Sequence, residues 1–203
     1  MSWVELAEKA ISELSSIDEA REKVLTEKRP LVRSAREAIF LCLEGKYSEA
    51  EEKVRSILIS LKELRDHISP FADVLSGYLD DVSQEVCEAS FLLLFLDGRR
   101  VIEDCLLICS PKALLLGLAD AALELRRVIL SYLLKNDFSR ASSLFEVMKQ
   151  IYRVLFPLPF PTSLIPLKPK VDALRAAMDK CASEIILSKR VNLISDASGP
   201  GGT

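Results

Sequence analysis

The sequence predicts an all-α protein, built as a bundle of about seven helices. Apolar residues recur at spacings of three and four along almost the whole chain, and the alternation of β-branched residues that marks strands is absent. The 7 glycines and 9 prolines gather at a few positions, which divide the chain into helix-length segments. We expect one helical domain over residues 1–197, followed by a disordered, glycine-rich tail over residues 198–203.

Boundary signals define the first three helices. The first is expected over residues 3–14, and Asp18 then offers an N-cap for a long second helix that ends at Gly45. The third is expected over residues 48–68. Pro70 ends it, because proline cannot donate the backbone hydrogen bond that continues a helix.

Further breaks divide the second half of the chain. Ser110-Pro111 is a helix start signal, since serine caps a helix and proline suits its first turn. Asn136-Asp137 ends that helix and caps the next. Five prolines within residues 157–169 predict an extended connection before the last helix. The helices expected in this half are 74–96, 110–135, 138–156 and 171–193, with a short segment over 101–109 between the first two.

Composition limits the classes of function. At 203 residues with 49% hydrophobic content, the chain can bury a substantial core. Its net charge of −3 and pI near 5.4 argue against a broadly basic surface, so a site for a polyanion has to be local. The longest apolar run, residues 89–96, is too short to cross a bilayer, and the charged N-terminus does not resemble a secretory signal. We therefore expect a cytoplasmic protein with no membrane partner.

The cysteine pattern indicates free thiols. The number is odd and no Cys-x-x-Cys occurs, so neither a disulfide scaffold nor a zinc knuckle is expected. Most of these residues fall in apolar runs, where a free cysteine behaves as a small buried hydrophobe. Cys105 and Cys109 are expected to share a helix face, where they can respond to oxidation. The five are Cys42, Cys87, Cys105, Cys109 and Cys181.

Two acidic pairs at helical spacing are the most informative local feature. Glu85 and Glu88 form one pair, Asp120 and Glu124 the other, and residues three or four apart share a helix face. If the two helices pack together, four carboxylates crowd one site, which calls for a cation; oxygen ligands suit Mg²⁺ or Mn²⁺. Gly117, on the same stripe as Asp120, permits a close approach of another backbone. From the spacing alone, solvated faces or ion pairs to Arg126 and Arg127 are the favoured alternative.

A basic stripe precedes these acids in the chain. Arg29, Arg33 and Arg36 follow one helix face with no acid between them, and planar guanidinium groups favour phosphate contact. The stripe therefore fits the backbone of a nucleic acid. A salt-bridged exposed face is the alternative interpretation.

The second acidic segment and the residues after it resemble the translin family. The likeness rests on Leu-Leu-Gly-Leu-Ala-Asp-x-x-x-Glu-Leu-x-Arg at residues 115–127, on Asn136-Asp137-Phe138 and on a final amphipathic helix. Gln-Glu-x-x-Glu-Ala at residues 84–89 resembles the branch of translin-associated factor X (trax). In that branch this segment supplies two catalytic acids, which match Glu85 and Glu88, and a third matches Asp120.

The resemblance implies a Mg²⁺-dependent endoribonuclease in a closed shell of identical subunits, expected to be an octamer, around single- or double-stranded RNA. It assigns catalysis to Glu85, Glu88 and Asp120, and metal binding to these three with Glu124. Arg127 joins the arginine stripe as a candidate for RNA binding or pairs with Glu124. Two alternatives stay open: a non-catalytic, translin-like protein that binds single-stranded RNA or DNA, and a helical scaffold that serves only assembly.

Overall fold

The structure, a computed structural model, describes residues 2–197; the expected tail over 198–203 lies outside the described residues. All regular elements in the described part are helical, which confirms the predicted fold class. None of its helices combines the length and the apolar character that crossing a bilayer requires. The α-helices are α1 (Trp3–Leu43), α2 (Tyr47–Ile68), α3 (Ala72–Leu75), α4 (Asp80–Asp97), α5 (Ile102–Ile108), α6 (Pro111–Leu134), α7 (Phe138–Leu155) and α8 (Lys168–Ala197), with 3₁₀ turns η1 (Ser69–Phe71) and η2 (Ser76–Leu79).

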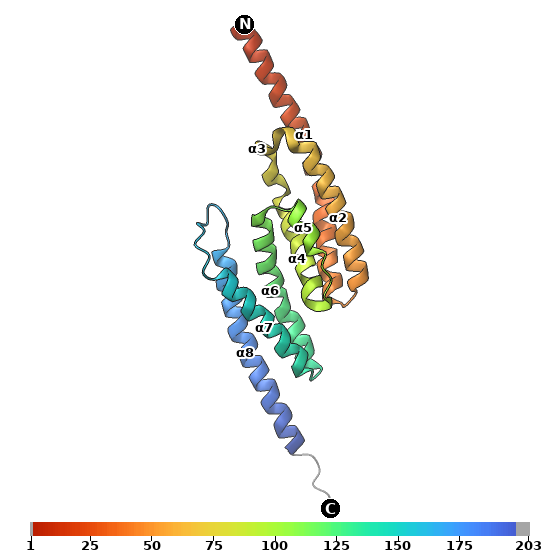
Figure 1. Ribbon diagram of the computed structural model, residues 1–203, viewed down its shortest axis with the longest axis vertical. Coiled ribbons are helices and arrows are strands. Elements are labelled where there is room, and N and C mark those ends of the chain that lie inside the picture. Colours follow the sequence, from red (N-terminus) through yellow and green to blue (C-terminus); the bar gives the residue numbers. More distant parts are fainter. Residues whose placement is uncertain (1, 198–203) are drawn as a thin grey trace, which may run out of the picture.

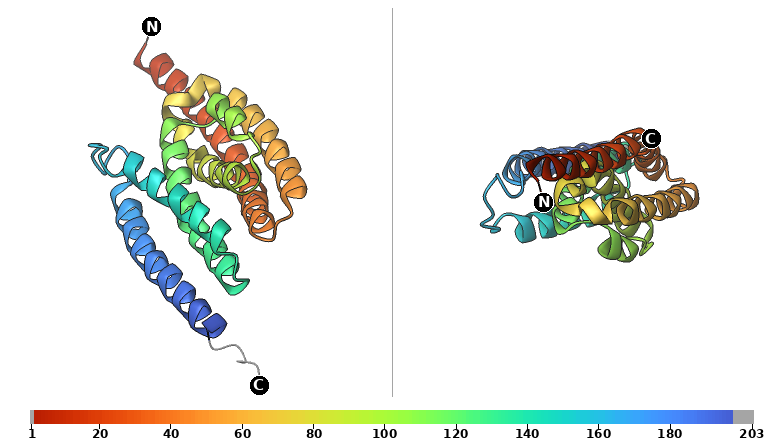
Figure 2. Two further views of the ribbon diagram at one scale, coloured as in Figure 1. Left: turned by 60° about the horizontal axis from the view of Figure 1, so that its bottom comes forward. Right: turned by 90° about the horizontal axis from the view of Figure 1, so that it is seen from above.

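The two central helices, α4 and α6, form the most extensive helix pair of the structure. The N-terminal helices α1 and α2 pack on α4, while the C-terminal helices α7 and α8 pack on α6. The short α5 lies against α2, α4 and α6 (Figure 1 and Figure 2). The α4–α6 contact therefore joins the two halves of the chain, and it carries both predicted acidic pairs.

Helix α1 is continuous where the sequence predicted two helices, so the break expected before Asp18 was wrong. The hydroxyl groups of Ser15 and Ser16 donate to the carbonyl oxygens of Ile11 and Ser12 one turn earlier, which keeps both serines within the helix. The carboxylate of Asp18 pairs with Arg21 at 2.8 Å instead of capping a new helix. The local polar groups are thus satisfied without a break.

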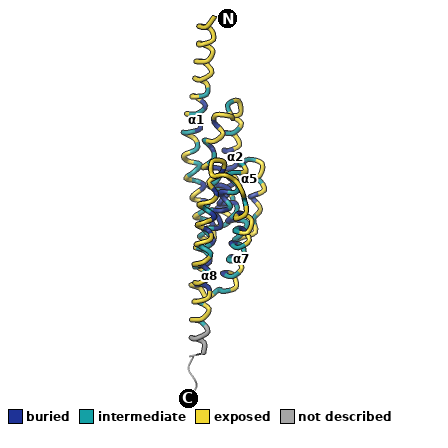
Figure 3. The backbone as a smooth tube through the Cα atoms, turned by 90° about the vertical axis from the view of Figure 1, so that its left-hand side faces the viewer, coloured by how far each residue is buried: buried dark blue, intermediate teal, exposed yellow. Residues whose placement is uncertain are grey.

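Residues 3–16 of α1 form an arm that extends beyond the bundle (Figure 1). A capping box stabilises its start: the Ser2 hydroxyl accepts from the Glu5 amide, and the Glu5 carboxylate accepts from the Ser2 amide. No side chain in residues 2–16 is buried, and the first buried one belongs to Ala20 (Figure 3). The arm exposes large apolar side chains: Trp3, Val4, Leu6, Ile11 and Leu14.

Helix α4 begins at Asp80, six residues later than the predicted start at residue 74. The intervening residues form η1, α3 and η2, in which the serine and glycine at positions 76 and 77 are poor helix formers. Leu75 and Leu79 still point into the core, where both are almost fully buried. The tighter turns of this segment therefore keep its apolar side chains inside while they change the path of the chain.

The helix boundaries predicted in the second half are confirmed to within a few residues. Ser110 caps α6, since its hydroxyl accepts from the Ala113 amide at 3.2 Å. Asn136 adopts a left-handed backbone conformation with φ 58°, and Asp137 caps α7 by accepting from the Arg140 amide. The proline-rich connection leads to α8, which begins at Lys168 instead of residue 171.

Gly117 lies where α6 crosses α4 at the smallest separation. A Cβ atom at this position would lie 2.7 Å from Cys87 Cβ, 2.8 Å from the Gln84 carbonyl oxygen and 2.9 Å from the Glu88 amide nitrogen. Two of these atoms belong to the α4 backbone and cannot move aside alone. The close backbone approach predicted from this glycine is therefore present.

We expect Gly117→Ala to lower the free energy of unfolding by about 1–3 kcal/mol, because the two helices would have to separate. Urea unfolding measures the change. Gly77→Ala is the matched control, since a Cβ there meets no atom within 4 Å. Equal stability of the two variants would contradict the close approach.

Candidate functional site

The four predicted acids come together at the crossing of α4 and α6. Glu85 and Glu88 extend from α4, and Asp120 and Glu124 extend from α6. Glu88 is 9% exposed, whereas the others are more open to solvent. Burial, together with the negative charges of Asp120, Glu85 and Glu124, raises the pKa of Glu88 to about 8. Among the described residues, Glu88 has neither an ion pair nor a side-chain hydrogen bond.

Each of the other three acids has a cation of its own. Glu85 pairs with Arg36 of α1 at 3.1 Å, and Glu124 pairs with Arg127 at 3.1 Å on the same helix. Asp120 binds the ammonium group of Lys170 from α8 and accepts a 2.6 Å hydrogen bond from the Gln84 amide. The site is therefore a cluster of acids held by separate cations from α1, α6 and α8.

Sequence reasoning missed Lys170 as a member of this site. It belongs to the first turn of α8, directly after the proline-rich connection, and lies 50 residues from Asp120 in the chain. No periodicity links the two positions, so only the packing of α8 on α6 brings them together. Gln84, which donates to Asp120, was also missed as a member of the site. Its position directly before Glu85 in the acidic segment is the sequence feature that could have indicated it.

The arginine stripe lies exposed on α1. Arg29 and Arg33 have no ion-pair or hydrogen-bond partner in the described part of the chain, and they line two shallow clefts together. Arg36 lines one of these clefts and also reaches Glu85. The stripe therefore runs from free guanidinium groups to the edge of the acidic cluster, and the salt-bridged alternative holds only for Arg36.

Arg127 occupies a separate position. Its side chain pairs with Glu124 and lines a cleft with Tyr47, Tyr132 and Lys135, between the end of α1 and α6. The neighbouring Arg126 pairs instead with Glu184 of α8 at 2.6 Å. Arg127 thus borders the acidic cluster but does not extend the stripe formed by Arg29, Arg33 and Arg36.

The fold and much of the sequence are shared with a protein solved in complex with nucleic acid. The structure of AfC3PO bound to duplex RNA superposes with a TM-score of 0.80 at 30% sequence identity, over 92% of this chain and 98% of that one. The chain belongs to the C3PO/translin family. A second structure of AfC3PO superposes with a TM-score of 0.78 at the same identity.

Other comparisons relate this translin-family chain to more distant proteins. The structure of NeC3PO without ligand has a TM-score of 0.77 at 17% identity, over 90% of this chain and 96% of that one, and shows the same fold. An uncharacterized protein of Methanocaldococcus jannaschii is 25% identical over 178 residues, or 87% of this chain and 79% of that protein. No protein-family model matches the chain.

The donor atoms of this translin-family site suit a hard cation, but their present arrangement does not enclose one. In the described part of the chain, no three carboxylates have oxygen atoms that all lie within 4.8 Å of one another. The physical reason is that Glu85, Asp120 and Glu124 each turn toward a cationic side chain. All four acids offer oxygen, the ligand that Mg²⁺ and Mn²⁺ prefer. A bound ion would therefore have to compete with Lys170 and Arg36.

The raised pKa of Glu88 predicts that the metal-free protein loses stability as the pH rises. The folded state holds the Glu88 proton more tightly than the unfolded state, so this stabilisation is complete below about pH 4.5 and is lost as the pH passes about 8. The loss is on the order of a few kcal/mol. Urea unfolding in EDTA between pH 5 and pH 9 measures it.

Glu88→Gln should remove most of this pH dependence, because an amide stays neutral throughout. Glu63→Gln, at an exposed position of α2, is the control and should unfold like the wild type at every pH. If the free energy of unfolding changed with pH in parallel for the wild type and Glu88→Gln, Glu88 would be shown to be already ionised at neutral pH.

Proposed function

We propose that this protein is a trax-like, Mg²⁺-dependent endoribonuclease. The observation that carries the proposal is the buried Glu88 carboxylate at the α4–α6 crossing, with Glu85, Asp120 and Glu124 around it. Repulsion of this kind disfavours four ionised acids unless a cation is bound between them. The similarity to AfC3PO, whose structure contains duplex RNA, supports RNA as the polyanion that meets this site.

The arginine stripe supplies the RNA-binding surface in this proposal. Arg29 and Arg33 have guanidinium groups free to contact phosphates, and Arg36 lies between them and the acids. A phosphate bound by Arg36 would draw its guanidinium away from Glu85 and leave that carboxylate free to turn toward Glu88. RNA binding and completion of the acidic site would thus be coupled through one side chain. Arg127 would contact the RNA from the opposite side of the cluster.

Glu85, Glu88, Asp120 and Glu124 would hold the metal ion, with Mn²⁺ as a substitute for Mg²⁺. The ion would lower the pKa of a bound water and stabilise negative charge on the scissile phosphate. Glu88 would release its proton when a cation binds at the site, because the cation offsets the repulsion from the neighbouring carboxylates that favours the protonated form. Lys170 would leave Asp120 and become available to the phosphate. Burial at the crossing keeps Glu88 largely shielded from water.

Self-association belongs to the same proposal. The large apolar side chains of the α1 arm are exposed, and they would be covered by the equivalent surface of a second copy. A closed octamer would place the arginine stripes inside, which reconciles RNA binding with a net charge of −3. Sedimentation velocity of the full chain measures the assembly.

A non-catalytic, translin-like RNA- or DNA-binding protein is the second candidate. It is favoured by the ion pairs in the structure, since Lys170 and Arg36 already balance two of the four acids without a metal. Under this proposal the acids only stabilise the crossing of α4 and α6, and the arginine stripe carries the whole function.

We expect the wild type to cut an end-labelled RNA at internal positions in Mg²⁺, to leave 3′-hydroxyl ends and to stop in EDTA. Glu88→Gln should lose at least about 100-fold in rate, since it removes a ligand of the ion that activates the attacking water. Denaturing gels resolve the product lengths and ends.

Glu63→Gln is again the control and should cut at the wild-type rate. Circular dichroism shows whether Glu88→Gln remains folded. Full activity of a folded Glu88→Gln would disprove the assignment of this site, whereas RNA binding by a wild type that does not cut with either metal would favour the second candidate.

The arginine stripe predicts a specific change in salt dependence. Arg33→Ala should weaken RNA binding and reduce the slope of log affinity against log salt concentration by about one, as expected for the loss of one phosphate contact. Fluorescence anisotropy at several salt concentrations measures the slope. Arg153→Ala, which removes an exposed arginine of α7, should leave it unchanged. Equal slopes for Arg33→Ala and Arg153→Ala would contradict the assignment of the arginine stripe to the RNA-binding surface.

A further inference from the structure

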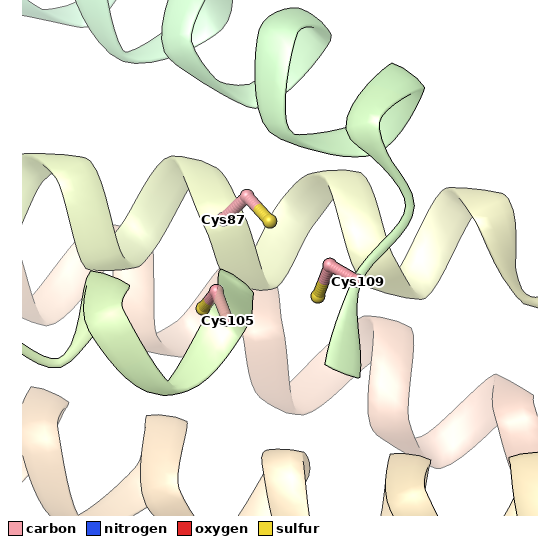
Figure 4. A group of neighbouring side chains, drawn as sticks. All are labelled: Cys87, Cys105 and Cys109. Carbon is pink, nitrogen blue, oxygen red and sulfur yellow. The ribbon is translucent and has the colours of Figure 1, made fainter. Parts of the chain in front are cut away.

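Three of the five cysteines meet in the core and form a group that contains no residue of the acidic cluster. Cys87 extends from α4, Cys105 from α5, and Cys109 from extended backbone directly after α5 (Figure 4). Their Sγ atoms all lie within 4.8 Å of one another. Cys87 and Cys105 are fully buried and Cys109 is 7% exposed. This is the one group of three or more potential metal ligands that the described part of the chain brings within such a distance.

The other two cysteines, Cys42 and Cys181, are buried thiols outside this group. Cys42 donates a weak hydrogen bond to the Ala89 carbonyl oxygen at 3.7 Å, and Cys181 is fully buried near the Arg126–Glu184 ion pair. Neither approaches a second sulfur in the described structure. The role of a small buried hydrophobe, expected for most of the five, fits these two well. Burial of separate small hydrophobes does not by itself explain why three sulfur atoms from two segments of the chain lie within 4.8 Å of one another.

The surroundings of the three thiols supply one oxygen and one positive charge. The Ser90 hydroxyl lies 3.3 Å from Cys105 Sγ, while its proton is donated to the Val86 carbonyl oxygen. Arg65 of α2 lies within electrostatic reach of Cys109, and its Nε atom is buried without a hydrogen-bond partner in the described part of the chain. A buried, unpartnered guanidinium nitrogen near the Cys109 thiol is the kind of group that negative charge on that sulfur would satisfy.

Coordination chemistry selects the class of ion. Soft thiolate ligands favour thiophilic metals over Mg²⁺ or Mn²⁺, which prefer oxygen. Structural Zn²⁺ sites are almost always four-coordinate, and no fourth cysteine, histidine or carboxylate joins these three thiols in the described part of the chain, where the Ser90 oxygen lies beside Cys105. Monovalent copper is a soft ion that accepts sulfur ligands alone. The positive charge of Arg65 would offset part of the negative charge of its thiolates.

We propose that Cys87, Cys105 and Cys109 form a thiolate site for one thiophilic metal ion, with Cu⁺ as the ion that fits best. Each thiol that binds the ion through its sulfur releases its proton to solvent, and no electron is transferred. Arg65 and Ile108, which directly precedes Cys109 in the chain, line an open cleft between α2 and α5. The site stands independently of the proposed ribonuclease function, since it uses different ligands and a different metal.

Loading the full chain by anaerobic refolding in Cu⁺ tests the site directly, because the ligands are accessible before the core closes. Excess Cu⁺ is removed with a colorimetric Cu⁺ chelator, and the retained copper is measured by atomic absorption. We expect one copper per chain in the wild type and a higher melting temperature than for the metal-free protein, since the three assembled thiols of the folded chain bind the ion more tightly than the separate thiols of the unfolded chain. Zn²⁺ loaded in the same way should be removed by a chelator of comparable strength.

Cys105→Ser should lose the retained copper, and Cys42→Ser, an equally buried cysteine outside the group, should keep it. Cys109→Ser tests the same loss at the edge of the core, where a failure to fold is least expected. Absence of copper from the wild type, or one copper per chain in folded Cys105→Ser and Cys109→Ser, would overturn the site. Retention of Zn²⁺ in place of Cu⁺ would overturn the choice of ion.

Discussion

The close crossing of α4 and α6 is the contact on which the rest of the structure depends. It joins the N-terminal helices that pack on α4 to the C-terminal helices that pack on α6, so the two halves share one core through it. Gly117 permits the crossing because any side chain there would meet the α4 backbone. The same short distance brings Glu85 and Glu88 near Asp120 and Glu124. One glycine therefore determines both how the halves pack and how densely negative charge gathers between them.

The charges at this crossing are balanced unevenly. Lys170, Arg36 and Arg127 each neutralise one acid from a different direction, whereas Glu88 lies at the centre with no cation of its own. Burial and repulsion together favour its neutral form. A cationic ligand and a polyanion would act on this balance in the same direction: the first would take the place of the lysine and arginine, and the second would draw them away from the acids.

Local signals in the sequence account for most of the helix boundaries and for the acidic cluster. Ser110-Pro111 and Asn136-Asp137 act locally, since the Ser110 hydroxyl and the Asp137 carboxylate accept hydrogen bonds from amides three residues later. Gly117 permits the close approach of another helix at its own position. The break expected before Asp18 failed because Ser15 and Ser16 satisfy their hydroxyl groups within the helix. Lys170 beside Asp120, and Cys87 beside Cys105 and Cys109, join segments far apart in the chain. No spacing rule reports such pairs, so they follow only from the packing of whole helices.

The N-terminal arm of α1 has a consequence for the energetics of folding. Helices in globular proteins gain most of their stability from a buried face, and an isolated segment of about 15 residues is marginal in water. The arm buries no side chain before Ala20, so its capping box and intrinsic propensity have to maintain it alone. If a second copy covers its apolar side, the helical state of the arm is governed by mass action. The bundle would then keep its order on dilution, while the arm would unwind first.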